Sequence, residues 1–308
     1  MLKNLTAIIL TYKTDEKILD NCIQSINSSI NICIVENSND QNIKDKLQNK
    51  YPNIDVVLSG NNFGYGAGNN FGLNHINTRY ALIINPDIVL DSNFFSIVKS
   101  YFDKGIEFNI MGISYKNNLE WNTAGYFKNN QNNNQNLINP IDSSLIAVDW
   151  VAGCTMLIDL DKFDKKNIFD ENIFLYFDEF DLCQIVKKNN GTVFTSKKLL
   201  VNHLGNKGSS STNINHRLSS EILRNWHWMW STFYYYKKHY GYFYALRKTY
   251  FKLLKSFFKI IYYKIFYNKD KFYINLYRFL GLLDSMLGKK SAYRNPDFSD
   301  QETSSGSS

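Results

Sequence analysis

Strand-like and helix-like segments alternate over the first hundred residues, and this alternation constrains the fold more than any other feature. Four apolar runs have the length and composition of buried strands, and they span residues 5–12, 30–37, 54–60 and 79–90. A single helix-like segment separates each run from the next. Strands joined in this way pair in parallel and are covered by helices on both faces. The sequence therefore predicts an α/β protein with a doubly wound, mostly parallel sheet.

Polar residues end three of these runs. In open parallel sheets, ligands bind beyond the carboxyl ends of the strands, so side chains at these ends are candidates for a binding site. The three groups are Thr11-Tyr12, Glu36-Asn37-Ser38 and Asn85-Pro86-Asp87. From the residues alone, Asp87 has two interpretations of equal weight. Its carboxylate can hold a divalent metal, or it can cap the turn that follows Pro86.

A glycine-rich segment at 59–74 raises the question of nucleotide binding. A dinucleotide-binding fingerprint requires Gly-x-Gly-x-x-Gly after the first strand, whereas this segment has Gly64-x-Gly66-x-Gly68 after the third. The sequence has no Gly-x-x-x-x-Gly-Lys loop either. Two interpretations remain: an amide-rich loop that accepts a phosphate at a helix N-terminus, or a plain helix entry whose glycines permit tight packing. The segment by itself favours the second.

Three acidic residues, Asp178, Glu179 and Asp181, lie within four positions in "FDEFDLC". One carboxylate of such a cluster can act as a general base, because neighbouring carboxylates raise one another's pKa towards neutral pH. Acidic residues in the first turn of a helix also interact favourably with the helix dipole. From the residues alone, this second interpretation is preferred.

Five motifs occur in a fixed order and fall on the strand ends described above. They are "ILTYK", "IVENSND", "NNFGYGAGNNFG", "IINPDI", and "VDWVAGCTMLI" with "FDENIFLYFDEFDLC" and "VNHLG". Together they resemble the family 2 glycosyltransferases of the rhamnosyltransferase-like branch, over roughly residues 5–206 and more weakly to about 239. The resemblance implies a GT-A fold and an inverting transfer from a nucleotide-diphosphate sugar.

The resemblance also implies roles for individual residues. The donor-binding residues would be Thr11, Tyr12, Glu36, Asn37, Asn62, Gly64, Asn70, Asn85 and Asp87. Asp87 and His203 would hold a divalent metal, Mg²⁺ or Mn²⁺. The catalytic residues would be Glu179 as the base, with Asp178 and Asp181 orienting it or binding acceptor hydroxyls. Trp150 and Gly153 would border the acceptor pocket, although core packing explains Trp150 about equally well.

Three departures from the family pattern bear on these roles. Glu36-Asn37 stands where the family has a base-reading pair of aspartates, which leaves the nucleotide open. Asn85 replaces one aspartate of the metal motif, which weakens the expectation of a tightly held metal. The order Asp178-Glu179 reverses the usual pair, which leaves the base open between Glu179 and its neighbours.

The C-terminal part of the chain carries the positive charge. The whole chain has a formal charge of +7, and residues 237–290 contain thirteen Lys and Arg against two acidic residues. Lysines at 248, 252, 255 and 259 line one helical face, and aromatic and aliphatic residues occupy another. This pattern is typical of a helix at an anionic membrane surface. The alternative is that the apolar face packs on the catalytic domain. No nucleic-acid-binding motif accompanies the charge, so we expect no nucleic acid as a partner.

We therefore expect three parts: a GT-A catalytic domain at 1–215, a helical membrane-interface extension at 216–290 and a disordered tail at 291–308. The four scattered cysteines predict a cytoplasmic protein, and no apolar run is long enough to span a membrane. With the basic helices, this predicts a location peripheral to the inner face of the membrane. The expected activity transfers rhamnose or a hexose from a dTDP- or UDP-linked donor to a glycan or glycolipid acceptor. The alternative is a non-catalytic scaffold of the same fold that binds nucleotide sugars or glycans.

Overall fold

The computed structural model describes residues 2–115, 123–126, 138–204 and 214–294 of the 308. They divide into two compact units. The first unit comprises Met1–Asp170 and Asp178–Ser210, and the second comprises Glu171–Phe177 and Ser211–Ser308. The assignment of 171–177 to the second unit was not expected from the sequence, because these residues directly precede the acidic cluster.

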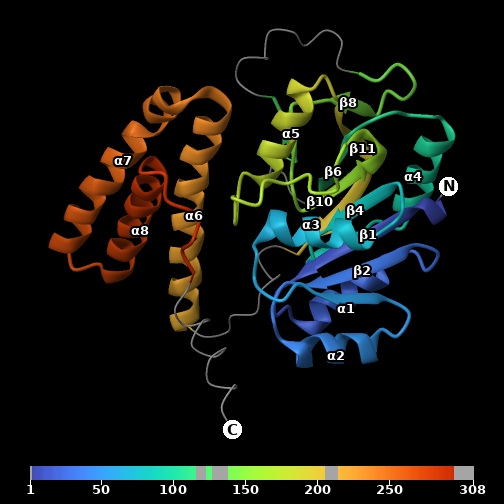
Figure 1. Cartoon of the computed structure of the whole chain (residues 1–308), viewed down its shortest axis with the longest axis horizontal. Coiled ribbons are helices and arrows are strands. Elements are labelled where there is room, and N and C mark those ends of the chain that lie inside the picture. The colour runs from blue at the N-terminus through green and yellow to red at the C-terminus, as the bar shows by residue number, and fades with distance from the viewer. Residues whose placement is uncertain (1, 116–122, 127–137, 205–213, 295–308) are drawn as a thin grey trace. The chain divides into compact units, whose positions relative to one another are not determined.

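The first unit is built on a nine-stranded sheet in the order β3-β2-β1-β4-β10-β6-β11-β5, with β8 paired to β11 (Figure 1). Its strands are β1 (Leu5–Thr11), β2 (Asn31–Glu36), β3 (Asp55–Leu58), β4 (Tyr80–Ile84), β5 (Ile88–Leu90), β6 (Ile110–Tyr115), β8 (Leu145–Ala147), β10 (Thr155–Asp159) and β11 (Val193–His203). The pairing makes β1, β2, β3, β4, β6 and β11 run in one direction and reverses β5, β8 and β10. A two-stranded sheet joins β7 (Ala124–Gly125) to β9 (Trp150–Val151).

Helices cover both faces of this sheet, as the sequence predicts. They are α1 (Glu16–Gln24), α2 (Gln41–Lys50), α3 (Tyr65–His75), α4 (Phe94–Asp103) and α5 (Asp178–Lys188). Alternate residues of β1 enter different apolar clusters: Ala7 and Ile9 pack with residues of α1 and α4, whereas Ile8 packs with residues of α3 and α5. Two separate cores of this kind define a doubly wound sheet.

The run at 79–90, predicted as one strand, is broken into two. β4 ends at Ile84, and β5 pairs with β11 at the far edge of the sheet. Pro86 has no backbone N–H to continue the ladder, which accounts for the break. The break places Asp87 in the turn between the two strands, next to the last residues of β11.

The glycine-rich segment is mostly helix and not loop. α3 begins at Tyr65, and its N-cap Gly64 has a φ of 87°, which glycine adopts without strain. A Cβ at Gly68 would lie 2.7 Å from Leu10 Cδ1, and one at Gly72 would lie 2.8 Å from Ile8 Cγ2. These glycines let the helix lie closely on the sheet, which is the packing interpretation that the segment itself favoured.

The second unit consists of α6 (Ile214–Tyr240), α7 (Tyr242–Ile265) and α8 (Lys269–Met286) together with residues 171–177. Its core contains Met229, Phe233, Ala245 and Leu282.

No helix among the described residues is long and apolar enough to cross a bilayer. Of the predicted tail, residues 291–294 are described and contact α6 through His227, and 295–308 lie outside the described residues.

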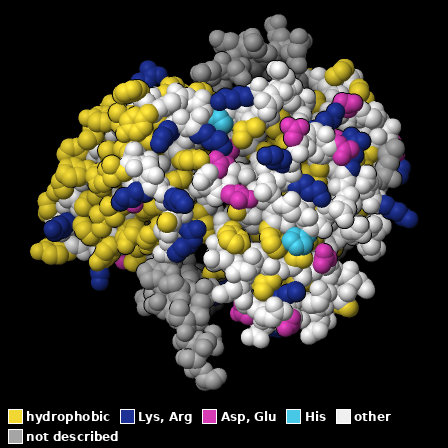
Figure 2. All heavy atoms as spheres, in the orientation of Figure 1, with side chains coloured by type: hydrophobic (Ala, Val, Ile, Leu, Met, Phe, Trp, Pro, Cys, Tyr) yellow, Lys and Arg dark blue, Asp and Glu magenta, His cyan; other side chains and the backbone are white. Residues whose placement is uncertain are grey.

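α7 presents three different faces. Small residues at 245, 249 and 256 are buried on the packed face, and lysines occupy the neighbouring face. The third face is apolar and exposed: Phe243, Phe251 and Phe258 are 84%, 77% and 62% accessible. Figure 2 shows hydrophobic side chains gathered over this helix, with basic side chains among them.

Candidate functional site

The carboxyl ends of β1 and β2 form a buried polar cluster. Thr11 Oγ1 donates to Glu36 Oε2 at 2.8 Å and to the Val35 carbonyl at 3.1 Å, and the Lys13 N–H donates to Glu36 Oε1 at 3.4 Å. Thr11 and Glu36 are both almost fully buried, whereas Tyr12 is half-buried. The cluster therefore fixes the shape of this edge, where Tyr12 and Lys13 are half-buried.

Asn37 connects this edge to the entry of α3. Its Nδ2 donates to the Gly64 carbonyl at 3.0 Å, and its Oδ1 accepts from the Phe63 N–H at 3.2 Å. The Asn62 side chain accepts from the Gly64 N–H at 3.1 Å. Asn37, Asn62 and Gly64 are thus brought together at the N-terminus of α3. A helix N-terminus favours a phosphate through its dipole and its backbone N–H groups.

Asn70 has a structural role in this fold. Its Nδ2 donates to the Phe169 carbonyl and its Oδ1 accepts from the Phe169 N–H, both at 3.0 Å, and the side chain is buried. A contact of Asn70 with the donor stays a prediction, because these bonds direct its amide into the protein.

Asp87 and His203 meet where β5 pairs with the end of β11. Asp87 Oδ2 lies 3.3 Å from His203 Nε2, and the Leu204 N–H donates to the Asp87 carbonyl at 2.9 Å. The Tyr115 ring stacks on His203 with 5.4 Å between centroids. Asn85 is held through its backbone, which donates to the Cys154 carbonyl at 2.8 Å. No group of three or more His, Cys, Asp or Glu within the described part of the chain could hold a metal.

The three acidic residues lie in the first turn of α5, and they differ in how far they are exposed to solvent. Asp178 and Asp181 are buried, whereas Glu179 is half-buried. Asp178 accepts a hydrogen bond from the Gly66 N–H at 3.2 Å, and burial with the nearby Glu179 charge raises its pKa well above the usual range. Burial raises the pKa of Glu179 to about 7. Glu179 is therefore the member of the cluster that can both reach a ligand and titrate near neutral pH.

The two predicted acceptor residues lie beside this turn. A Cβ at Gly153 would lie 3.3 Å from Glu179 Cβ, so Gly153 keeps space next to the carboxylate. The Trp150 ring packs against Phe180 with 4.7 Å between centroids. Tyr65 donates from its hydroxyl to the Gly153 carbonyl, which connects the first residue of α3 to the same place.

Tyr115 and Cys154 link the Asp87 and Glu179 regions, and sequence reasoning missed both. Their side chains lie 2.6 Å apart between Tyr115 Oη and Cys154 Sγ. Burial chiefly raises the pKa of each, and the charges of both Asp87 and Glu179 raise it further. Asp87 and Glu179 are therefore both close enough to Tyr115 and Cys154 for their charges to influence these two side chains. The position of Tyr115 at the carboxyl end of β6 is the signal that could have identified it.

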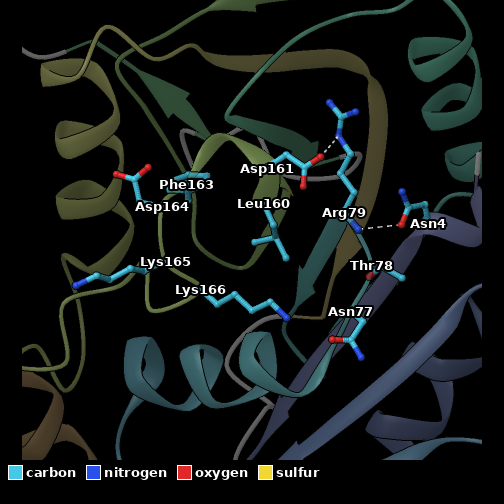
Figure 3. Close-up of a pocket in the computed structure, with 10 residues that line it drawn as sticks. All are labelled: Asn4, Asn77, Thr78, Arg79, Leu160, Asp161, Phe163, Asp164, Lys165 and Lys166. Atoms are coloured by element: carbon cyan, nitrogen blue, oxygen red, sulfur yellow. Dashed lines mark hydrogen bonds and ion pairs between the residues drawn. The ribbon is translucent and has the colours of Figure 1, made fainter.

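A hollow lies at the amino-terminal end of the parallel strands. It is lined by residues next to the amino ends of β1 and β4, among them Asn4, Thr78 and Arg79 (Figure 3). Arg79 is bound there by Asp159, through Nε and Nη2 at 2.9 Å and 2.7 Å. This hollow is away from the strand ends that carry the predicted site residues, so it is not part of the candidate site.

Comparisons with known proteins agree with this arrangement. The model of the family "Glycosyl transferase family 2" matches residues 6–165, which is just over half of the chain. The low-salt glycan biosynthesis hexosyltransferase Agl10 of Haloferax volcanii is 26% identical over 200 residues, 62% of this chain and 64% of the relative. The rhamnosyltransferase WbbL of Escherichia coli K12 is 24% identical over 170 residues, 49% of this chain and 64% of the relative. The matches thus span under two thirds of either relative.

Among solved structures, GalNAc-T7 with UDP, GalNAc and Mn²⁺ superposes with a TM-score of 0.50 at 9% identity. The superposition covers 82% of this chain and 57% of that one. At this identity the likeness concerns the fold, and it confirms the predicted GT-A class. The sheet, the family match and the two curated relatives agree: this chain belongs to glycosyl transferase family 2.

Proposed function

We propose that the protein transfers a sugar from a nucleoside-diphosphate donor to an acceptor hydroxyl with inversion at the anomeric carbon. The observation that carries the proposal is the state of Glu179. It is half-buried, whereas the other two acids of the cluster are buried, and its pKa is raised to about 7. Its charge raises the pKa of Tyr115 and Cys154, as the charge of Asp87 also does. A base with a pKa near the working pH combines a deprotonated fraction with enough basicity to accept a proton.

In this mechanism Glu179 accepts the proton of the acceptor hydroxyl. The acceptor oxygen forms a bond to the anomeric carbon, and the bond from that carbon to the diphosphate oxygen breaks with its electron pair on the diphosphate. Asp178, held by the Gly66 N–H, fixes the first turn of α5 from which Glu179 projects. Gly153 leaves space for the acceptor beside the carboxylate, and Trp150 provides an aromatic side chain near it.

The donor binds at the carboxyl ends of β1, β2 and β4 in this proposal. Tyr12 faces the nucleotide base, and the Thr11–Glu36 and Asn37 bonds keep that edge in shape. The N-terminus of α3 at Gly64 lies beside the diphosphate, with Asn62 and Asn85 as neighbouring amides. The nucleotide is dTDP or UDP, and the sugar is rhamnose or a hexose. The acceptor is a lipid-linked or polysaccharide glycan.

The Asp87–His203 pair fits a divalent metal. A carboxylate oxygen and an imidazole nitrogen 3.3 Å apart are a donor set that suits Mn²⁺ better than Mg²⁺. Two protein ligands leave positions for diphosphate oxygens, which agrees with the lack of a three-residue cluster among the described residues. When bound, the metal would neutralise the charge that develops on the leaving diphosphate.

Glu179→Gln tests the activity proposal against nucleotide-sugar donors. We expect this variant to lose transfer by at least about a hundredfold while it retains donor-induced thermal stabilisation. Glu107→Gln is the matched control, since Glu107 is exposed and pairs with Lys162 at the surface. Unchanged transfer in Glu179→Gln would remove the base assignment. Donor binding without transfer in the unmodified protein would favour the non-catalytic scaffold, to which Asn85 in the metal motif also points.

We further propose that the second unit attaches the enzyme to the cytoplasmic face of an anionic membrane. The apolar face of α7 is exposed, and lysines lie on the face beside it. A helix of this kind lies in the interface with its rings among the lipid chains and its lysines at the headgroups. Such attachment would bring the enzyme to a lipid-linked acceptor.

A further inference from the structure

Two consecutive bulky residues adopt the left-handed backbone immediately before α5. Tyr176 has a φ of 67° and Phe177 a φ of 69°. α5 begins at Asp178, directly after this pair. Left-handed backbone is unfavourable for aromatic residues and persists only where the surroundings hold it. The pair therefore needs a source of restraint.

α6 supplies that restraint within the second unit. Ser231 Oγ donates to the Leu175 carbonyl at 2.9 Å. The Trp228 ring contacts the rings of Tyr176 and Phe177, with 5.2 Å and 5.4 Å between centroids. The Tyr235 ring contacts Phe177 at 5.3 Å. Residues 228, 231 and 235 are three and four positions apart, so they lie on one face of the helix.

The start of the same segment is anchored separately. Phe174 is buried, its ring lies 4.7 Å from that of His227, and the Arg294 guanidinium lies 3.5 Å from its centre. His227 is itself held by Ser291 Oγ at 3.0 Å and by the Tyr293 carbonyl at 2.9 Å. The segment is thus fixed at both ends, and the left-handed pair is the last point of attachment before α5.

Glu179 follows Phe177 by two residues, a chain distance of at most about 7 Å. The φ values at 176 and 177 therefore set how the chain enters the first turn of α5. If the pair relaxed to right-handed backbone, the helix could extend towards its N-terminus, as the sequence pattern allows. Asp178 and Glu179 would then lie in the interior of a longer helix and not in its first turn.

We propose that Trp228, Ser231 and Tyr235 are positioning residues of the transferase, which hold the left-handed Tyr176–Phe177 pair and thereby fix the direction of the Glu179 carboxylate. The inference rests on the proposed role of Glu179. It gives the helical extension a function in the reaction besides attachment, because the catalytic helix begins from a segment that belongs to the second unit.

Trp228→Leu and Ser231→Ala test the proposal by steady-state kinetics with a nucleotide-sugar donor. We expect kcat to fall by about tenfold or more in each, with the donor KM changed by less than about twofold. Trp228→Phe keeps a ring at this position and should restore most of kcat. Ser256→Ala is the matched control, since this buried serine donates only within its own helix, to the Lys252 carbonyl at 2.9 Å.

Trp230→Phe controls for loss of stability. Trp230 is buried on α6 and donates to the Lys289 carbonyl at 3.0 Å, so this variant should lower the melting temperature without the selective loss of kcat. If Trp228→Leu and Ser231→Ala keep wild-type kcat, the positioning role is wrong. The positioning role is also wrong if Trp228→Leu and Ser231→Ala lower kcat no further than Trp230→Phe does when the three variants lose the same stability. Glu179→Gln in the same assay distinguishes the two failures. An active Glu179→Gln contradicts the base and with it this inference, whereas wild-type kcat in Trp228→Leu and Ser231→Ala beside an inactive Glu179→Gln contradicts the positioning role alone.

Discussion

The backbone N–H of Gly66 donates to Oδ1 of Asp178 at 3.2 Å, and this bond joins the glycine-rich helix to the acidic helix across 112 residues of sequence. Two motifs that look independent in the sequence therefore form one structural unit. The bond also explains why position 66 is a glycine: a Cβ there would lie 2.7 Å from the same oxygen and 3.0 Å from Phe169 Cβ. The first turn of α5 can approach α3 only because this side chain is absent.

Gly66→Ala should reduce transfer more than it reduces stability. The added methyl group displaces the Asp178 carboxylate, so we expect kcat to fall at least about tenfold, with a loss of about 1–3 kcal/mol in unfolding free energy. Gly72→Ala is the control, because its Cβ would meet Ile8 and Val35 and no acidic residue. It should lose similar stability in urea unfolding while the folded fraction keeps its kcat. Equal kinetic loss in both variants would contradict the specific role of the Gly66–Asp178 bond.

The pH dependence of transfer should follow the titration of Glu179. The base acts when deprotonated, so a pKa raised to about 7 predicts that kcat rises about tenfold per pH unit below 7 and levels off above it. Burial is what raises the pKa of Glu179. Its charge in turn raises the pKa of the titratable groups around it, which are Asp178, Tyr65, Tyr115, Cys154 and Cys183. A pH–rate profile under donor saturation measures this. A midpoint near 4.5, the ordinary value for a glutamate, would show that burial does not control the base.

Donor binding should depend on a divalent metal that is held by Asp87 and His203. Both Asp87→Asn and His203→Ala should weaken Mn²⁺-dependent donor binding, because each removes one of two protein ligands in the proposed site. Thermal shift with a nucleoside diphosphate, with Mn²⁺ or with EDTA, provides a readout that does not depend on turnover. His75→Ala serves as control, since His75 is exposed on α3 and bonds the Phe71 carbonyl. Identical Mn²⁺ responses in all three variants and the wild type would refute the metal site.

The second unit should lose stability in mild acid because of His227. Burial lowers the pKa of His227 to about 3 from its ordinary 6.5. Below pH 6.5 the unfolded chain therefore binds a proton at this residue that the folded chain does not, so unfolding becomes easier as pH falls. Between pH 7.5 and 5 this costs about 2 kcal/mol. His227→Gln should show a pH dependence smaller by that amount in urea unfolding, and His75→Gln should not. Equal slopes in His227→Gln and wild type would contradict this prediction.

The exposed face of α7 should bind anionic bilayers. We expect the protein to float with vesicles of phosphatidylglycerol and phosphatidylcholine and less with phosphatidylcholine alone. Phe251→Ser with Phe258→Ser should weaken flotation, since each buried ring contributes about 1.5–3 kcal/mol. Ile141→Ser, a change at an exposed apolar residue of the first unit, should have no effect. Flotation that is the same in all variants would exclude α7 as the attachment surface. Concentration-dependent dimers without flotation would assign the face to a second copy.

Local pattern was enough to predict much of this protein. The alternation of apolar runs predicted the doubly wound sheet, because burial on both faces requires continuous apolar strands. The polar residues at the strand ends indicate where the candidate site lies, because parallel strands place those ends at one edge of the sheet. Helical spacing predicted a basic face on α7 beside an apolar one, and the structure leaves that apolar face exposed.

Only the tertiary structure decided how these pieces act on one another. The break at Pro86 sends β5 to the far edge, and this brings Asp87 to His203 across more than a hundred residues. α5 starts at Asp178, directly after a left-handed pair that no periodicity indicates and that α6 contacts through Trp228. Our proposal of Glu179 as the base among three acids rests on its half-buried position and its raised pKa. Sequence spacing reports a residue's own helix or strand, whereas burial, long-range hydrogen bonds and raised pKa values arise from segments that meet only on folding.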